Sequence, residues 1–260
     1  MKIFTCPQCD GALFFDNAAC TCGLAVAYDP VAGTFVEASS PCANREVIGC
    51  NWVADDGGRC RSCAMTAVHP DPAVAENGPL WSKAELAKRW VIANLMAWGW
   101  FTDRDPGPLP EFRMLAESTA SGETKVIMGH ASGVVTINLA EADAAERIRR
   151  RDALGEPYRT MIGHFRHELA HYLFATCADF VPRFRELFGD ETWDYGEALD
   201  RYYQAGPPSD WQNFHVTPYA AAHPHEDWAE SASHILHVTD IVDSFAAAGL
   251  SGADLPPAGY

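Results

Sequence analysis

The sequence has few basic residues for its length. It holds 19 Lys and Arg against 35 Asp and Glu, which gives a formal net charge of −16 at pH 7. Nucleic-acid binding depends on clustered Lys and Arg that contact phosphates, so this balance argues against a nucleic-acid partner. The acidic excess does not identify a cationic substrate, because acidic surfaces also keep proteins soluble.

Long apolar runs are also missing. No stretch reaches the roughly 18 apolar residues of a membrane-spanning helix, and the start, MKIFTCPQCD, lacks the apolar core of a signal peptide. The sequence therefore predicts a cytoplasmic protein that does not contact a membrane. Its 260 residues are 48% hydrophobic, enough for one large or two modest domains with a buried core.

Cysteine is almost absent after residue 63. Eight of the nine cysteines lie between Cys6 and Cys63, and Cys177 stands alone. In a reducing compartment such a cluster indicates metal binding rather than disulfides. We interpret Cys177 as a small buried hydrophobic side chain.

The clustered cysteines form two quartets, each suited to one tetrahedral zinc ion. The first comprises Cys6, Cys9, Cys20 and Cys22, and the second comprises Cys42, Cys50, Cys60 and Cys63. Residues 1–75 are too few to bury a large core, so we predict a double zinc-ribbon module that metal stabilises. With four basic and eight acidic residues, this module is expected to dock a protein partner or to cover the rest of the chain as a lid or cap.

Proline and glycine mark the end of this module. His69-Pro-Asp-Pro72 and Asn77-Gly-Pro79 predict a linker, which places a boundary near residue 76 and a second domain over 76–260. Ser82 is the expected N-cap of the next helix, with Glu85 completing a capping box. Apolar residues at helical spacing continue that helix to Gly99.

Three short strands are predicted next, over residues 111–116, 125–128 and 133–139, with a turn at 129–133. We interpret the last strand as a sheet edge, and an ordinary edge strand is the alternative to a functional one. A functional edge would accept a substrate peptide by β-pairing, through Gly133, Val134, Val135 and Asn138. Residues 141–154 are expected to form a helix whose four arginines are either solvated or an anchor for an acidic group.

The strongest motif is His167-Glu-Leu-Ala-His171, within an apolar helical pattern over 159–175. Positions i and i+4 share one face of a helix, so His167 and His171 can bind one Zn²⁺. Glu168 then points to the open coordination side, where a metal-bound water would lie, and is the candidate general base. A surface helix with two chance histidines is the alternative.

A third ligand is expected downstream, because catalytic zinc usually has three protein ligands and one open position. Pro224 can begin a helix on which Glu226 and Glu230 lie one turn apart. We assign Glu226 as the ligand and Glu230 as the acceptor of a hydrogen bond from a ligating histidine. Tyr219 is the candidate donor to a tetrahedral oxyanion, and a packed tyrosine is the alternative.

Two further helices are predicted between these motifs, over residues 182–188 and 192–204. A break at 206–210, rich in Gly and Pro, follows them.

Together these segments resemble bacterial zinc-binding metallopeptidases that carry an N-terminal zinc ribbon. The resemblance covers nearly the whole chain. Its N-terminal part is the cysteine array with Cys50-Asn-Trp52 and Cys60-x-x-Cys63. The later matching motifs are, in chain order, Val135-Thr-Ile-Asn-Leu-Ala-Glu-Ala-Asp143, Glu156-Pro-Tyr-Arg-Thr160, His167-Glu-x-x-His171, Gly206-Pro-Pro-x-Asp-Trp211 and His223-Pro-x-Glu-Asp-x-Ala-Glu230. Cys20-x-Cys22 departs from the C-x-x-C usual in that family, which bears on the geometry of the first ribbon.

More distantly, Tyr219 followed by Glu226-x-x-x-Glu230 looks like the catalytic end of anthrax lethal factor, a gluzincin. That resemblance implies that Tyr219 assists the transition state, that Glu226 binds zinc and that Glu230 supports a histidine.

The expected fold is α+β, with two zinc-ribbon units before a gluzincin-like domain in which a short sheet lies over the motif helix. The expected activity is hydrolysis of peptide bonds in a peptide or protein substrate, with Zn²⁺ at one catalytic and one or two structural sites. Two alternatives stay open. One is an amidase or esterase that acts on non-peptide substrates, and the other is an interaction module whose zinc ions are all structural.

Overall fold

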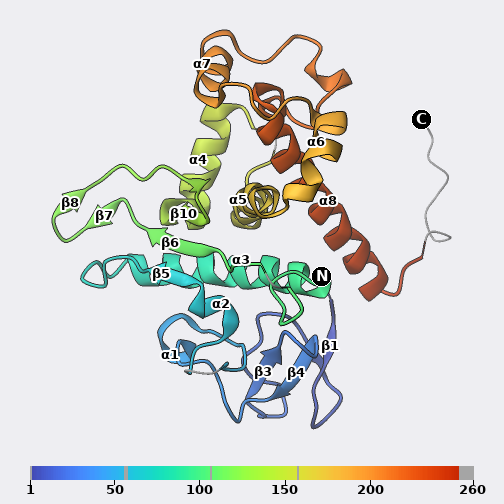
Figure 1. Cartoon of the computed structure of the whole chain (residues 1–260). Coiled ribbons are helices and arrows are strands. Elements are labelled where there is room, and N and C mark those ends of the chain that lie inside the picture. Colours follow the sequence, from blue (N-terminus) through green and yellow to red (C-terminus); the bar gives the residue numbers. More distant parts are fainter. Residues whose placement is uncertain (1, 56–57, 106, 157, 252–260) are drawn as a thin grey trace. The chain divides into compact units, whose positions relative to one another are not determined.

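A computed structural model describes residues 2–55, 58–105, 107–156 and 158–251. They divide into two compact units, formed by the described parts of 1–60 with 235–260 and by those of 61–234. Strands and helices mix along the chain, which confirms the predicted α+β class (Figure 1). The domain boundary near residue 76 stays a prediction, because a compact unit need not be a segment that folds on its own.

The first unit is built from short hairpins and one short helix. β1 (Phe4–Thr5) pairs antiparallel with β2 (Ala12–Leu13), β3 (Val26–Asp29) pairs antiparallel with β4 (Thr34–Glu37), and α1 (Arg45–Ile48) follows. Tyr28 lies at the centre of the aromatic core. Its ring packs on those of Phe4, Phe15, Phe35 and Trp52 at centroid distances of 5.1 to 5.7 Å. This aromatic core is small, as expected for a segment of this length.

The second unit contains a four-stranded mixed sheet. After α2 (Arg61–Ala64), the strand order is β5 (Thr66–Val68), β6 (Glu111–Leu115), β10 (Val134–Asn138) and β9 (Gly129–Ala131). β6 runs parallel to both β5 and β10, whereas β9 is antiparallel to β10. A separate hairpin joins β7 (Ser118–Thr119) to β8 (Gly122–Glu123).

The strand predicted over 125–128 and the turn predicted over 129–133 are both wrong. Residues 125–128 have no regular structure, and the strand is β9, at the place where the turn was expected. The reason is that Ser132 and Gly133 both have positive φ, 50° and 83°, which is the backbone of a two-residue hairpin turn.

The prediction that 133–138 is a sheet edge is also wrong. β10 pairs with β6 on one side and with β9 on the other, so its backbone cannot add a peptide along Val134–Thr136. The edges of this sheet are β5 and β9.

α3 (Asn77–Ala97) begins five residues before the predicted cap at Ser82. Pro79 lies in the first turn, where a backbone N–H has no helical partner and its loss is harmless. Glu85 is buried and serves in the core instead of capping the helix. It accepts a hydrogen bond from Thr66 Oγ1 at 2.6 Å and pairs with Lys88 Nζ at 2.8 Å.

The helices predicted over 141–154, 159–175, 182–188 and 192–204 correspond to α4 (Ala144–Leu154), α5 (Met161–Thr176), α6 (Val181–Phe188) and α7 (Tyr195–Ala205). The helix predicted to begin at Pro224 is α8 (Pro224–Ala247). Short 3-10 helices that were not predicted accompany them, namely η1 (Leu139–Ala142), η2 (Ala178–Phe180), η3 (Trp211–Asn213) and η4 (Tyr219–Ala222). Among the described residues, no helix combines the length and apolar character needed to cross a bilayer.

The motif helix is anchored to the sheet and to α3. Figure 1 shows α5 along its axis, between α4 and α6, and it contacts α3, β9 and β10. Thr160 caps it by accepting a hydrogen bond from the Gly163 N–H at 2.9 Å. Phe165, Leu169 and Tyr172 bury one face, which leaves the two motif histidines on another.

Candidate metal centre

Three side chains from two helices converge. His167 and His171 lie one turn apart on α5, and Glu226 lies in the first turn of α8. The Nε2 atoms of the two histidines are 3.2 Å apart. Glu226 Oε2 is 3.0 Å from His167 Nε2, and Oε1 is 3.5 Å from His171 Nε2. One donor atom of each residue lies within 4.8 Å of the others.

The donor set fits zinc in chemistry and spacing. Two nitrogens bound to one tetrahedral zinc at 2.0–2.1 Å would lie about 3.3 Å apart. Glu226 is 1% exposed, and within the described chain its Oε2 has no partner in hydrogen-bonding geometry. Leaving a buried carboxylate oxygen without a partner is costly. A cation held by the three side chains would remove that cost.

Glu230 lies one turn after Glu226 and supports the first histidine. Its Oε1 is 2.7 Å from His167 Nδ1, so this nitrogen can donate while Nε2 faces the ligand cluster. The indole N–H of Trp228 donates to the Ala170 carbonyl at 2.7 Å, which ties α8 to α5 between the two ligand histidines.

Charge in the cluster is strongly coupled. Burial alone would lower the pKa of His167, but its contacts with Glu226 and Glu230 raise that pKa well above the usual value. Burial opposes ionisation of Glu226, yet the two histidines lower its pKa strongly. Zinc binding needs an unprotonated Nε2 on His167, so it should weaken as the pH falls.

A cavity of about 620 Å³ opens beside the cluster, and its wall includes His167, Glu168 and Tyr219. Glu168 is 7% exposed. The Tyr219 ring lies 6.2 Å from that of His167. Burial, followed by the charge of Glu226, raises the pKa of Tyr219, so its phenol stays protonated and able to donate.

A buried ion-pair network also lines this cavity. Glu141, fully buried, lies 2.7 Å from Arg159, 3.4 Å from Arg150 and 3.2 Å from His164. Arg150 also pairs with Glu117 at 2.9 Å. The sequence left two interpretations of the arginines on this helix, a solvated face or an anchor for an acidic group. Arg150 fits neither, because it is partly buried and already pairs with Glu117 and Glu141.

The predicted substrate strand contributes little to the cavity. Asn138 lies in its wall, but its amide donates to Glu117 at 2.7 Å. Val135 is fully buried in the sheet, and neither it nor Gly133 or Val134 is among the described residues that line the cavity. Their role as substrate contacts stays a prediction.

Sequence reasoning missed Tyr195. Its hydroxyl donates to Glu226 Oε1 at 2.6 Å. The signal available was Asp194-x-x-Glu197, which predicts a helix start and places Tyr195 at its first residue. Nothing in the spacing links that position to Glu226, which lies 31 residues later.

The cysteine quartets have the spacing of zinc sites. Thiolates bound at about 2.3 Å to one tetrahedral zinc lie about 3.8 Å apart. In the first quartet the Cys6–Cys22 and Cys9–Cys20 Sγ pairs are 3.9 and 3.6 Å apart, and in the second the Cys50–Cys60 pair is 3.6 Å apart. In each quartet all four sulfurs lie within 4.8 Å of one another. The described cysteines form no disulfide.

The C-x-C spacing in the first quartet has a local explanation. The Gly23 N–H donates to the Cys20 carbonyl at 2.9 Å, and Gly23 has a φ of 93°, which residues with a side chain rarely adopt. This turn brings Cys20 and Cys22 into one cluster despite the missing residue.

Comparisons with known proteins agree with this geometry. Residues 77–259 match the model of a family described as "Putative zinc-binding metallo-peptidase". Uncharacterised proteins from Mycobacterium bovis and two strains of Mycobacterium tuberculosis are each 39% identical over 269 residues, which cover 97% of this chain and 78% of each relative. No solved structure matches significantly. The matched segment holds both motif histidines and Glu226, and the chain belongs to this putative zinc-binding metallopeptidase family.

Proposed function

We propose that the chain is a zinc-dependent peptidase with a gluzincin-like site. The observation that carries this proposal is the convergence of His167, His171 and Glu226 beside a cavity that also exposes Glu168. These three residues would hold the zinc ion. When bound, zinc supplies a Lewis acid that acidifies water and polarises the scissile carbonyl.

The chain's own residues supply the proton transfers. Glu168 accepts a proton from the attacking water and passes it to the leaving amine, as general base and then general acid. Tyr219 donates a hydrogen bond to the oxyanion that forms at the carbonyl. Glu230 keeps the proton on His167 Nδ1 and so holds the ring in orientation.

The remaining parts of the proposal concern partners. We propose a peptide or protein as substrate and structural zinc at the two cysteine quartets, with the ribbon module recruiting a protein partner. The shortage of basic residues supports the absence of a nucleic-acid partner.

Replacing Glu168 with Gln tests the mechanism. The variant should keep its zinc and lose at least about 100-fold in rate, the usual contribution of a general base. Cleavage of a proteome-derived peptide library, followed by mass spectrometry, measures the rate. Glu186→Gln is the control, because Glu186 is exposed and pairs only with the neighbouring Arg183 in this part of the described surface. An unchanged rate in Glu168→Gln would remove this residue from the mechanism.

The same assay distinguishes the two alternative functions, an amidase or esterase and an interaction module whose zinc ions are all structural. Small amides and esters that are turned over while peptides are not would favour the amidase or esterase. A protein that turns over neither, with a zinc ion at the histidine site that does not exchange, would favour a structural role for all the metals.

A further inference from the structure

The two carboxylate oxygens of Glu226 have different surroundings. Oε1 accepts the hydrogen bond from the Tyr195 hydroxyl at 2.6 Å. Oε2 has no hydrogen-bond partner among the described residues, and it lies 3.0 Å from His167 Nε2. Oε1 is thus hydrogen-bonded to Tyr195, whereas Oε2 lies against His167.

Tyr195 is itself held in place. It is the first residue of α7, where Asp194 accepts a hydrogen bond from the Glu197 N–H at 2.8 Å. Its ring packs edge-on against His223 at 5.2 Å, and His223 Nε2 lies 3.2 Å from the Trp193 carbonyl oxygen. The capped start of α7 and the ring contact with His223 therefore both restrain the phenol. A residue that positions a ligand needs such restraints on its own side chain.

We propose that Tyr195 is a positioning residue for the metal ligand Glu226, whose Oε1 it holds so that Oε2 is presented with His167 and His171 to zinc. This inference rests on the ligand set of the proposed function. A free carboxylate can rotate and present either oxygen, and it loses that freedom on binding. A hydrogen bond that fixes it beforehand lowers this loss and raises metal affinity.

Tyr195 and Tyr219 have different places in the candidate site. Tyr219 belongs to the cavity wall. Tyr195 is not among the described residues of that wall, and it contacts the ligand carboxylate instead. Loss of the Tyr195 hydroxyl should therefore weaken zinc binding, whereas loss of the Tyr219 hydroxyl should mainly lower kcat.

The test measures the Kd of the exchangeable zinc in the full-length protein, by competition with a fluorescent chelator at pH 7. Tyr195→Phe should weaken that Kd by about 10- to 100-fold, the usual effect of removing a residue that orients a ligand. Cobalt substitution gives a second readout, because the visible spectrum of Co²⁺ responds to a changed carboxylate ligand. The variant should fold, since Tyr195 is 44% exposed and Phe keeps the ring contact with His223.

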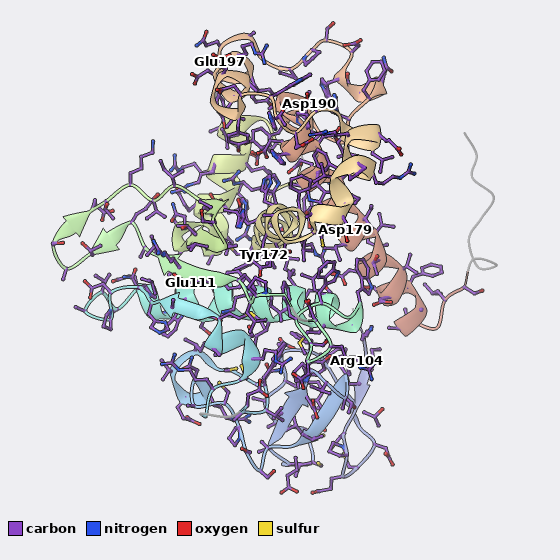
Figure 2. The ribbon with its side chains drawn as sticks, in the orientation of Figure 1. Arg104, Glu111, Tyr172, Asp179, Asp190 and Glu197 are labelled. Carbon is purple, nitrogen blue, oxygen red and sulfur yellow. The ribbon has the colours of Figure 1, made fainter. Side chains whose placement is uncertain are left out.

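Tyr172→Phe is the matched control. Tyr172, labelled in Figure 2, follows His171 in the sequence of α5, and its hydroxyl donates to the Pro108 carbonyl rather than to a ligand. Its zinc Kd should stay within about twofold of the wild-type value, because the ligand contacts are untouched. A wild-type Kd in Tyr195→Phe overturns the inference, even if turnover falls, since Tyr195 would then act on the substrate. A wild-type protein without exchangeable zinc would instead sink the proposed function.

Discussion

The pKa values of two buried carboxylates, Glu141 and Glu226, depend on the basic side chains around them. Glu141 has no exposed side-chain surface, yet burial does not keep it neutral, because Arg159 and His164 contact it directly. Burial raises its pKa, the hydrogen bonds and charges of His164 and Arg159 lower it, and the result is a pKa of about 2. Burial opposes ionisation of Glu226 in the same way, and its contacts with His167 and His171 lower its pKa. In both cases the groups around a buried carboxylate, rather than burial alone, decide its pKa.

Glu141→Gln should therefore destabilise the fold by about 3 kcal/mol at pH 7, because Arg159 and Arg150 lose a fully buried carboxylate partner, although they keep their pairs with Glu156 and Glu117. The folded-state pKa of about 2 lies below the ordinary value of 4.5. The stability from Glu141 is fully present above pH 4.5 and is lost as the pH falls towards 2. Denaturant unfolding of both proteins between pH 7 and pH 3 should show their difference shrinking below pH 4.5.

The control for this experiment is Glu111→Gln. Glu111 forms an exposed pair with Arg113 at 3.3 Å, and exposed pairs contribute less than about 1 kcal/mol. A difference between wild type and Glu141→Gln that stayed constant down to pH 3 would contradict the assigned pKa.

Individual elements differ in how far the sequence predicts them. α8 begins at Pro224 as predicted, α5 begins two residues after its predicted start, and α4 and α7 begin three residues after theirs, because a helix start depends mainly on its nearest neighbours. Two predicted strands are present as β6 and β10, whereas the strand predicted over 125–128 and the edge position of β10 were wrong, because they depend on distant pairing. The pairing of β9 depends on the turn at Ser132 and Gly133, and the central place of β10 depends on β6, which lies about 20 residues earlier.

The same division holds within the candidate site. The spacing on one helix predicts His167 with His171 and Glu226 with Glu230, since i and i+4 always share a face. Tyr195 could not be predicted, because its approach to Glu226 depends on how α7 and α8 pack. Local geometry therefore predicts the ligands, and only the tertiary structure shows what holds one of them.

The N-terminal cap of α5 gives a prediction at this scale. Thr160→Ala removes the acceptor for the Gly163 N–H, so the free energy of unfolding should fall by about 1 kcal/mol. Thr160→Ser keeps the hydroxyl and should retain most of that stability. Denaturant unfolding of the three proteins measures the difference, and equal stabilities would mean that tertiary contacts alone hold the start of the motif helix.

Across the whole molecule, the two kinds of candidate metal site have different surroundings. The aromatic core of the first unit is small, and all four cysteines of the second quartet are buried. Such a site contributes directly to folding, because the unfolded chain has no preformed cluster of thiolates. The histidine site is built on helices that pack through Phe165, Leu169 and Trp228, so its scaffold does not depend on the metal in the same way.

Cys50→Ser separates these two roles. Cys50 is fully buried, and its loss should reduce the bound zinc from three ions to two, because three sulfurs no longer complete a tetrahedral site. Residues 1–60 should then be cleaved faster by added protease, while the histidine site keeps its zinc and its activity. Metal analysis and mass spectrometry of the fragments measure both effects. Cys177→Ser, which changes a cysteine outside both quartets, should keep three zinc ions. Three zinc ions in Cys50→Ser would show that this quartet does not need its full set of thiolates.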